Sequence, residues 1–269
     1  MNESPMLTPT VTDDRINIVV PMAGLGSRFS QAGYRDPKPF IRIQSIPMID
    51  IVLANVTAGF RTDKINLYLI INPAHYPMLQ ATGILDVPCV SVIVCDPRGG
   101  MGAAVNVLRA SAFINNDTPL MIANSDQWMR FDVLHWYFDM MRNGECDGSI
   151  AVFENDNPKW SYAEIDSFGW VRRVAEKEAI SEWATCGAYL YRRGRDFVTA
   201  ANKMINLNER VNGEFYVCPA YNKMIYSMNS KIKAYTVQEM WGLGTPEDFE
   251  LSVKDKLGRI ELHGFSERA

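Results

Sequence analysis

A glycine-rich stretch near the start of the chain carries the first residue types that could do chemistry. The stretch GLGSR, residues 24 to 28, follows the apolar run INIVVPM of residues 16 to 22. Glycines allow the backbone to approach a phosphate closely, and an arginine can hold phosphate oxygens through two hydrogen bonds. The spacing is not the dinucleotide-binding GxGxxG, because Phe29 takes the third glycine position, and no GK[ST] of a Walker loop follows. The stretch therefore predicts a phosphate-binding loop of another kind.

A lysine held between two prolines follows this loop. Lys38 lies between Pro37 and Pro39, 10 residues after Arg28. Each proline fixes its own φ angle and favours an extended conformation in the residue before it, so the backbone at Lys38 is stiff before any ligand arrives. Such a lysine could meet the charge that develops on a phosphoryl group. A solvated lysine on a surface turn is the alternative, and the nearby GLGSR favours the functional interpretation.

An aspartate stands just after another apolar run. PLMIA, residues 119 to 123, is followed by Asn124, Ser125, Asp126 and Gln127. Open α/β sheets bind ligands at the carboxyl ends of their strands, and Mg²⁺ favours one or two carboxylates together with substrate phosphates. We therefore expect Asp126 to bind Mg²⁺ or Mn²⁺; a helix N-cap is its alternative role. Asn124 and Gln127 would either orient Asp126 or contact a ribose.

The apolar runs indicate how these residues are positioned. Strand-like runs alternate with helix-length segments, which predicts an α/β fold with a mixed, mainly parallel central sheet flanked by helices. The expected strands are 16–22, 65–71, 91–95, 119–123 and 148–154, and the expected helices are 47–60, 74–82, 101–113 and 131–143. Residues 161 to 193 alternate around a turn at 167–169, which predicts an antiparallel portion. A helix-rich tail follows, with a strand near 231–238 and a helix from Pro246.

Length and composition limit the remaining choices. The 269 residues, 47% hydrophobic and 22% charged, suit a globular domain, so we expect one domain over residues 15–269 after a loose leader at 1–14. The net charge of −4 favours no nucleic-acid partner, and no apolar run approaches the roughly 20 residues of a membrane span. The five cysteines lie far apart without a CxxC pair and predict free thiols. Together with a polar, acidic N-terminus unlike a signal peptide, they predict a cytoplasmic protein.

GLGSR after a first strand, followed by PKP, resembles the sugar-phosphate nucleotidyltransferases, also called NDP-sugar pyrophosphorylases. The resemblance runs from about residue 16 to about residue 250. It implies a Rossmann-like fold of the nucleotide-diphospho-sugar transferase (GT-A-like) type. It also implies transfer of a nucleoside monophosphate from a nucleoside triphosphate to a sugar 1-phosphate or a similar phosphorylated small molecule, with release of pyrophosphate.

The resemblance assigns roles by position. Arg28, Lys38 and Asp126 become the catalytic residues, and Asp126 also becomes the metal ligand. The glycine cluster RGGMGAA at residues 98 to 104 resembles the loop that packs against the nucleobase. The residues expected to bind the nucleotide are Ala23, Gly24, Leu25, Gly26, Ser27, Arg28, Gly99, Gly100, Met101, Gly102, Asn124 and Ser125.

The acceptor site follows from two later stretches. Glu176 and Lys177 resemble the family's EK motif, whose lysine binds the phosphate of the second substrate. Gly187, within TCGAY, resembles a glycine that leaves room for the acceptor. In the late stretch WGLGTPED, Gly242 takes the place where many relatives carry a second metal-binding aspartate. Either Asp126 and phosphates alone hold the metal, or Glu239 or Glu214 substitutes.

Two other functions remain alternatives. A metal-dependent GT-A glycosyltransferase would also place an aspartate after a central strand, but it would more usually show DxD and has no need of GLGSR with PKP. A non-catalytic, nucleotide-binding regulatory protein is suggested by Gly242. None of the three histidines stands in a catalytic context and no GxSxG occurs, which agrees with a reaction that needs no covalent nucleophile. A homo-oligomer is compatible with all three functions.

Overall fold

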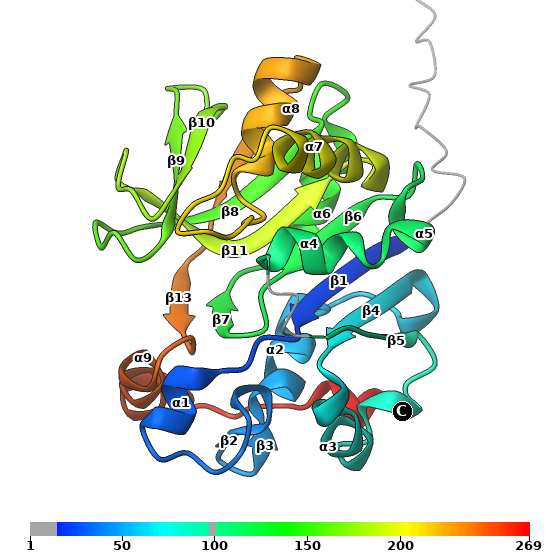
Figure 1. Ribbon diagram of the computed structural model, residues 1–269, viewed down its shortest axis with the longest axis vertical. Helices are drawn as coiled ribbons and strands as arrows, with labels where there is room; N and C mark the ends of the chain where they lie inside the picture. Colours follow the sequence, from blue (N-terminus) through cyan, green and yellow to red (C-terminus); the bar gives the residue numbers. More distant parts are fainter. Residues whose placement is uncertain (1–14, 97–100) are drawn as a thin grey trace, which may run out of the picture.

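Four parallel strands form one half of the central sheet in the computed structural model, which describes residues 15–96 and 101–269. They are β5, β4, β1 and β6 in spatial order, and each neighbouring pair is parallel. Their bounds are β1 (Ile16–Met22), β4 (Ile65–Ile71), β5 (Val90–Val94) and β6 (Leu120–Ala123). All four were expected from apolar runs, and the predicted α/β fold is confirmed (Figure 1).

Antiparallel pairing extends the sheet on the other side of β6. Strand β11 (Trp183–Tyr191) runs antiparallel to β6, and β8 (Gly148–Glu154) runs antiparallel to β11. Strand β12 (Ile232–Thr236) pairs in parallel with β8, and the hairpin of β9 (Ser161–Ile165) and β10 (Val171–Glu176) joins the other part of β11. The register of β11 against β8 shifts between Thr185 and Tyr189, so β11 is irregular where it passes the end of β6.

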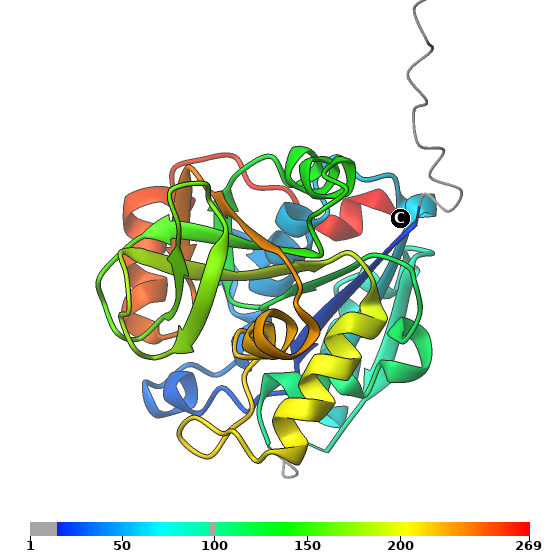
Figure 2. The ribbon, with the colours of Figure 1, turned by 90° about the horizontal axis from the view of Figure 1, so that it is seen from above.

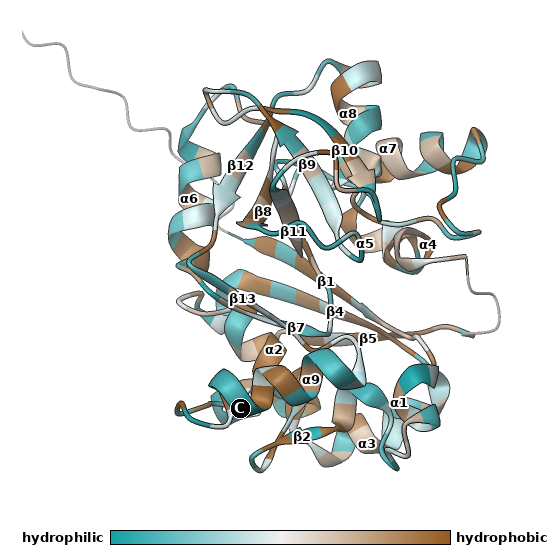
Figure 3. Ribbon diagram, turned by 90° about the vertical axis from the view of Figure 1, so that its left-hand side faces the viewer, coloured by the Kyte–Doolittle hydropathy of each residue, from teal (hydrophilic) through white to brown (hydrophobic). Residues whose placement is uncertain are grey.

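Helices cover both faces of this sheet, as Figures 1 and 2 show. Strand β1 serves both cores, since Ile18 and Val20 pack on one side and Val19 on the other, as alternation along a strand requires. One core includes α2 (Met48–Val56), α3 (Tyr76–Ala81) and α6 (Val133–Arg142); the other includes α4 (Ala103–Leu108), α5 (Ser111–Ile114), α7 (Gly194–Asn206) and α8 (Ala220–Met228). Figure 3 shows how apolar α2 is, which agrees with its nearly complete burial.

The structure differs from the expected elements in two respects. The helix expected over 101–113 is two short helices, α4 and α5, separated at Arg109 and Ala110. The strand expected to be fully buried at 91–95 is the edge strand β5, and its residues are only half-buried or exposed. An apolar run alone cannot distinguish an edge strand from a central one, because position in the sheet depends on pairing with distant segments.

Two small sheets were not expected. Strand β7 (Gln127–Arg130) pairs antiparallel with β13 (Glu239–Gly242), and β2 (Arg42–Ile43) pairs with β3 (Ile46–Pro47). Helix α1 (Ser27–Gln31) follows β1, and α9 (Pro246–Ser252) follows β13. The β7–β13 pair joins the end of the parallel half to the start of the C-terminal segment, as Figure 1 shows.

The C-terminal segment returns to α2. Ser266 donates to the buried carboxylate of Asp50 through its backbone N–H at 2.8 Å and its Oγ at 2.7 Å. Within the described part of the chain, no helix is long and apolar enough to cross a membrane. The leader expected at 1–14 lies outside the described residues.

Candidate functional site

A cavity of about 490 Å³ lies where β1 and β6 end, at the carboxyl edge of the parallel half of the sheet. Parallel α/β sheets bind their ligands at this edge. The cavity brings together ten of the residues predicted from the sequence: Gly24, Gly26, Ser27, Arg28, Lys38, Asn124, Asp126, Glu176, Lys177 and Gly187. These residues come from five separate segments of the chain.

The glycine loop combines an open position with a crowded one. No atom lies within 4 Å of the point where a Cβ at Gly24 would be, so this backbone is open to a ligand. Gly26 has a φ of +61°, and a Cβ there would lie 2.9 Å from the Cβ of Lys38. The second glycine is therefore needed for two reasons, a left-handed backbone and close packing against the lysine.

Lys38 and Asp126 form an ion pair inside the cavity, between Nζ and Oδ2. Lys38 begins a short 3₁₀ turn (Lys38–Phe40), and Asp126 lies between β6 and β7. The backbone carbonyl of Asp126 accepts a hydrogen bond of 2.8 Å from the N–H of Leu243, just after β13. The predicted lysine and the predicted metal ligand are thus neighbours, and the C-terminal segment holds the backbone of the aspartate.

Lys177 is held in a conformation that lysine rarely adopts. Its φ is +56°, in the left-handed region, which is uncommon for residues other than glycine and clusters at functional sites. Its Nζ donates to the hydroxyl of Tyr216 at 2.6 Å and lies 4.7 Å from the centre of the Tyr216 ring. A neutral phenol leaves the positive charge of the lysine available to an anionic ligand.

Glu176, beside this lysine, is largely withdrawn from solvent. Burial raises the pKa of Glu176, while a hydrogen bond from Ser161 and the charge of Lys177 act in the opposite direction. The carboxylate of Glu214, which also lines the cavity, raises the pKa further. Two carboxylates, Glu176 and Glu214, and the cation of Lys177 therefore share this part of the cavity.

Gly187 lines the cavity, and two amides occupy the space that a side chain at this position would take. Its φ is +68°, and a Cβ there would lie 2.4 Å from Nδ2 of Asn124 and 2.5 Å from Oε1 of Gln127. The glycine therefore makes room for these two amides where β11 is irregular. Gln127 is only 2% exposed, and its Nε2 has no hydrogen-bond partner in the described structure.

Gly242 does not leave a vacancy either. A Cβ at this position would lie 2.9 Å from Cη2 of Trp160, so the indole ring occupies the space. Glu239, suggested as a substitute metal ligand, is bound instead by Arg130 and Lys256, and it accepts a hydrogen bond from the indole of Trp241. These partners lower the pKa of Glu239 to about 2, and the residue does not line the cavity.

Several predicted nucleotide-binding residues are not part of the cavity wall. Ala23 is buried, Leu25 is 64% exposed outside the cavity, and neither Ser125 nor Met101 lines it. Gly102 also lies off the wall: its φ is +99°, and a Cβ there would lie 2.4 Å from the backbone oxygen of Phe215. It is required by this close backbone approach. Gly99 and Gly100 lie outside the described residues.

The sequence reasoning missed part of the wall. Residues that were not predicted to bind a ligand come from the loop before β9 and its first residue, from β11, from the segment before α8 and from the start of α9. They include Lys159, Trp160, Ser161, Tyr189, Tyr216, Val217, Cys218, Gly244, Thr245 and Asp248. The turn-forming NDNP before Lys159 and the GTPED around Asp248 were the available signals. Both read equally well as local structure, and Thr245 does cap α9 through its hydroxyl.

The donors in the cavity suit Mg²⁺ in combination with phosphates. Across residues 15–96 and 101–269, no three His, Cys, Asp or Glu side chains gather as a metal-binding group. Asp126 lines the cavity, and Gly244 lets it approach closely, since a Cβ there would lie 3.0 Å from its Oδ2. One or two carboxylates with substrate phosphates is the donor set that Mg²⁺ commonly uses.

The fold and the position of this cavity define a structural class, the nucleotidyltransferase (GT-A-like) fold. A nucleoside-diphosphate-sugar pyrophosphorylase from Vibrio cholerae RC9 has a similar structure, with a TM-score of 0.74 and 22% identity over 88% of this chain and 100% of that chain. The resemblance seen in GLGSR and PKP is therefore confirmed at the level of the fold.

Two further structures support this class. A putative glucose-1-phosphate thymidylyltransferase from Bacillus anthracis, in complex with a sucrose, has a TM-score of 0.74 and 17% identity over 94% of this chain and 99% of that chain. A UDP-glucose pyrophosphorylase complexed with UDP-glucose has a TM-score of 0.73 and 17% identity over 91% of this chain and 100% of that chain. No family model matches the sequence, and no curated protein matches it.

Proposed function

We propose that this chain is a nucleotidyltransferase that moves a nucleoside monophosphate from a nucleoside triphosphate to a sugar 1-phosphate or a similar phosphorylated small molecule. The observation that carries the proposal is the Lys38–Asp126 pair in the same cavity as the open backbone of Gly24, at the carboxyl ends of the parallel strands. A cation, a carboxylate and an open glycine backbone are what a triphosphate with its metal requires.

The reaction needs one displacement at phosphorus. An oxygen of the acceptor phosphate forms a bond to the α-phosphorus, the bond between the α-phosphorus and its bridging oxygen breaks, and pyrophosphate leaves with the electron pair. Positioning and neutralisation of charge accelerate such reactions, so no covalent nucleophile of the protein is required.

The residues of the cavity divide this work. Gly24 and Arg28 would hold the triphosphate, and Lys38 would neutralise charge on the reacting phosphoryl group. Lys177 would hold the acceptor phosphate, and Glu176 and Glu214 would accept hydrogen bonds from the rest of the acceptor. Asp126 would hold Mg²⁺ or Mn²⁺, and a bound metal would supply further neutralisation of phosphate charge.

Pyrophosphate release from a panel of nucleoside triphosphates and phosphorylated acceptors tests the proposal. We expect release only when a triphosphate, an acceptor and Mg²⁺ are present together. Asp126→Asn preserves the shape of the side chain but removes its charge, so the rate should collapse and the dependence on metal should shift. Lys231→Met, which alters a lysine outside the cavity, should leave turnover unchanged.

The same assay separates the alternatives. A glycosyltransferase would release a nucleotide from a nucleotide sugar and would form no pyrophosphate. A regulatory protein would bind a nucleotide without turnover of any substrate pair. Either result would contradict the proposed reaction.

A further inference from the structure

A second lysine–aspartate pair lies in the cavity beside the first. Nζ of Lys159, before β9, lies 2.6 Å from Oδ1 of Asp248 in the first turn of α9. Both residues line the cavity, and the Lys159 side chain is 39% exposed. The pair thus repeats the arrangement of Lys38 with Asp126, in which a lysine on the wall of the cavity is neutralised by a carboxylate on the same wall.

The backbone that carries Lys159 is well fixed. The side chain of Asn157 accepts a hydrogen bond from the N–H of Lys159 at 3.1 Å, and its carbonyl accepts one from the hydroxyl of Tyr162 at 2.8 Å. The carbonyl of Trp160 accepts a bond of 3.0 Å from the N–H of Lys177. Lys159 therefore has a fixed place relative to Lys177, the lysine that is expected to meet the acceptor.

The side chain of Lys159 lies over an aromatic ring that owes its place to a glycine. Nζ lies 4.9 Å from the centre of the Trp160 ring, a favourable cation–π distance. The ring fits against Gly242, where a Cβ would be 2.9 Å from it, and the same point is 3.8 Å from the Cβ of Asp248. Gly242, Trp160, Lys159 and Asp248 therefore form one unit, and any side chain at position 242 would disturb it.

A lysine facing a site for phosphates needs an anion when no phosphate is present, because an unpaired charge in a partly buried site is costly. Asp248 supplies that anion within the protein. A phosphate that enters the cavity offers the ammonium group more charge and more acceptor oxygens than one carboxylate does. The ammonium group of Lys159 can therefore exchange the carboxylate of Asp248 for a phosphate when one enters the cavity.

We propose that Lys159 is a further phosphate-binding residue of this site, and that Asp248 holds it in the absence of ligand as an internal competitor for the phosphate. This inference rests on the proposed function in one respect, because it assumes that the ligand of the cavity carries a phosphate. It assigns opposite effects to the two partners of one ion pair: Lys159 strengthens phosphate binding, and Asp248 weakens it.

Two variants and two binding measurements test this directly. Calorimetric titration with inorganic pyrophosphate, and KM values for the triphosphate and for the acceptor, are compared for Lys159→Met and Asp248→Asn. We expect Lys159→Met to weaken phosphate binding about tenfold, as loss of a charged hydrogen bond does. Asp248→Asn should tighten it by about threefold, since a partly exposed ion pair competes only weakly for the lysine. The KM that changes identifies the substrate whose phosphate Lys159 takes.

A matched pair of controls removes effects of overall charge. Lys231 and Glu145 form an ion pair of 2.7 Å outside the cavity, and Lys231 also lies near an indole ring, 5.9 Å from the centre of Trp170. Lys231→Met and Glu145→Gln change the net charge by the same amounts and should leave phosphate binding unchanged. Unfolding by urea checks that all four variants remain folded.

The proposal is overturned if the Lys159 and Asp248 variants shift phosphate affinity in the same direction, or if neither shifts it. Those results would make the pair an ordinary structural bridge. Pyrophosphate binding is measured without turnover, so this outcome is distinct from failure of the proposed reaction.

Discussion

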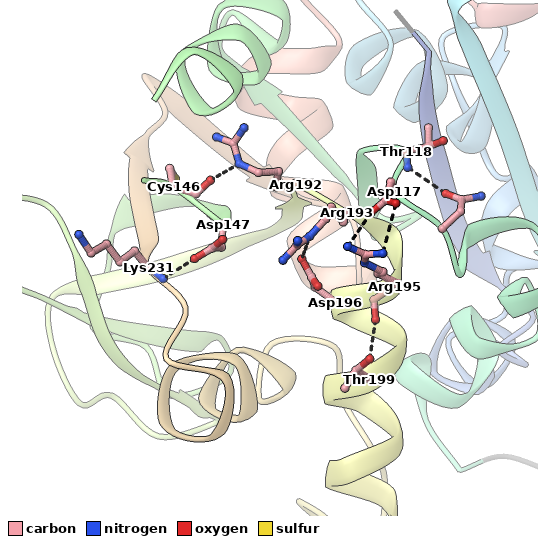
Figure 4. Close-up of polar contacts among 11 residues, drawn as sticks. Asp117, Thr118, Cys146, Asp147, Arg192, Arg193, Arg195, Asp196, Thr199 and Lys231 are labelled. Carbon is pink, nitrogen blue, oxygen red and sulfur yellow. Dashed lines mark hydrogen bonds and ion pairs between the residues drawn. The ribbon is translucent and has the colours of Figure 1, made fainter. Parts of the chain in front are cut away.

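The carboxyl ends and the amino ends of the parallel strands use the same kinds of side chain in opposite ways. At the carboxyl edge of the parallel strands, the cavity holds arginine, lysine and acidic residues whose bonding is incomplete or strained. At the opposite edge, arginine and aspartate residues form the cluster shown in Figure 4. There Arg193 pairs with Asp196 at 2.8 Å, and Arg195 pairs with Asp117 at 2.8 Å.

Arg192 shows how fully the opposite edge is bonded. Its guanidinium donates to the carbonyls of Cys146 at 2.6 Å, Met140 at 2.7 Å and Asn143 at 2.5 Å. The carbonyls of Met140 and Asn143 belong to the end of α6. Such carbonyls have no partner within the helix and attract positive charge, so the guanidinium of Arg192 satisfies them. With a longer bond of 3.4 Å from Nη1 to the carbonyl of Met141, these bonds use four of the five N–H donors of this arginine.

The cavity edge shows the contrary pattern. The side chain of Arg28 makes no hydrogen bond or ion pair with any described residue, Lys177 has a left-handed backbone, and Nε2 of Gln127 is buried without a partner in the described structure. Incomplete bonding lowers stability and persists where binding or catalysis needs it. The comparison teaches that the bonding of charged side chains, more than their type, distinguishes the cavity end of the parallel strands from the opposite end.

Among the variants that test this comparison, Lys38→Ala should have the largest effect, a loss of catalytic rate. Loss of one preorganised charged contact typically lowers a catalytic rate by about 10²–10³. The side chain of Lys38 is 18% exposed, and within the described residues it bonds only to Asp126, so the fold should survive. Measurement of kcat with thermal unfolding as a control tests both statements. Near-normal turnover in the variant would remove Lys38 from the reaction.

Arg192→Met should have the opposite effect, with lower stability and unchanged catalysis. Removal of several charged hydrogen bonds to backbone carbonyls should lower the free energy of unfolding by about 3 kcal/mol, because those carbonyls are left without partners. KM and kcat of the folded fraction should not change. Urea unfolding and steady-state kinetics on one preparation are the measurements, and a changed KM would show that the two edges are coupled.

Glu176→Gln should reveal the raised pKa of this carboxyl group through stability. The native state holds the proton of Glu176 more tightly than the unfolded chain does. Stability due to this group is therefore present below the usual pKa of glutamate and decreases as pH rises towards the raised pKa. The glutamine variant should be the more stable protein at neutral pH, and the difference should disappear in acid. A constant difference at all pH values would contradict the raised pKa.

The smallest effect is expected from Asp117→Asn. The Arg195–Asp117 pair is exposed, with side chains 47% and 70% accessible, and such pairs contribute about 0.2–1 kcal/mol. Neither kinetics nor stability should change beyond this amount, and added salt should remove the difference. A larger loss would show that the cluster at the opposite edge acts cooperatively.

Much of the fold could be predicted because three of the parallel strands, β1, β4 and β6, are buried on both faces. β1 and β4 have the bounds expected from their apolar runs, and GLGSR with PKP located the residues of the first two site segments. These signals are local, since glycine, proline and apolar runs restrict the backbone wherever they occur.

The rest of the site depends on contacts between distant segments. Nothing in the neighbourhood of Lys159 or Asp248 indicates that the two residues meet, because they are 89 positions apart. The same holds for Gly242, whose meaning changes once Trp160 is seen against it. A glycine that replaces an expected aspartate looks like a loss in the sequence, whereas the structure shows a different packing.

The pairing of β7 with β13 has a consequence for the order in which the protein folds. Gln127 to Arg130 find their partner strand in residues 239 to 242, and Asp126 receives its backbone hydrogen bond from Leu243. Contacts so distant in sequence form late, because the intervening chain must first be brought together. During synthesis, a chain that has emerged only as far as residue 238 could form the parallel strands but not the wall that positions Asp126. We therefore expect a nascent chain to acquire its sheet well before its affinity for substrates, and to be inactive until its last segment has left the ribosome.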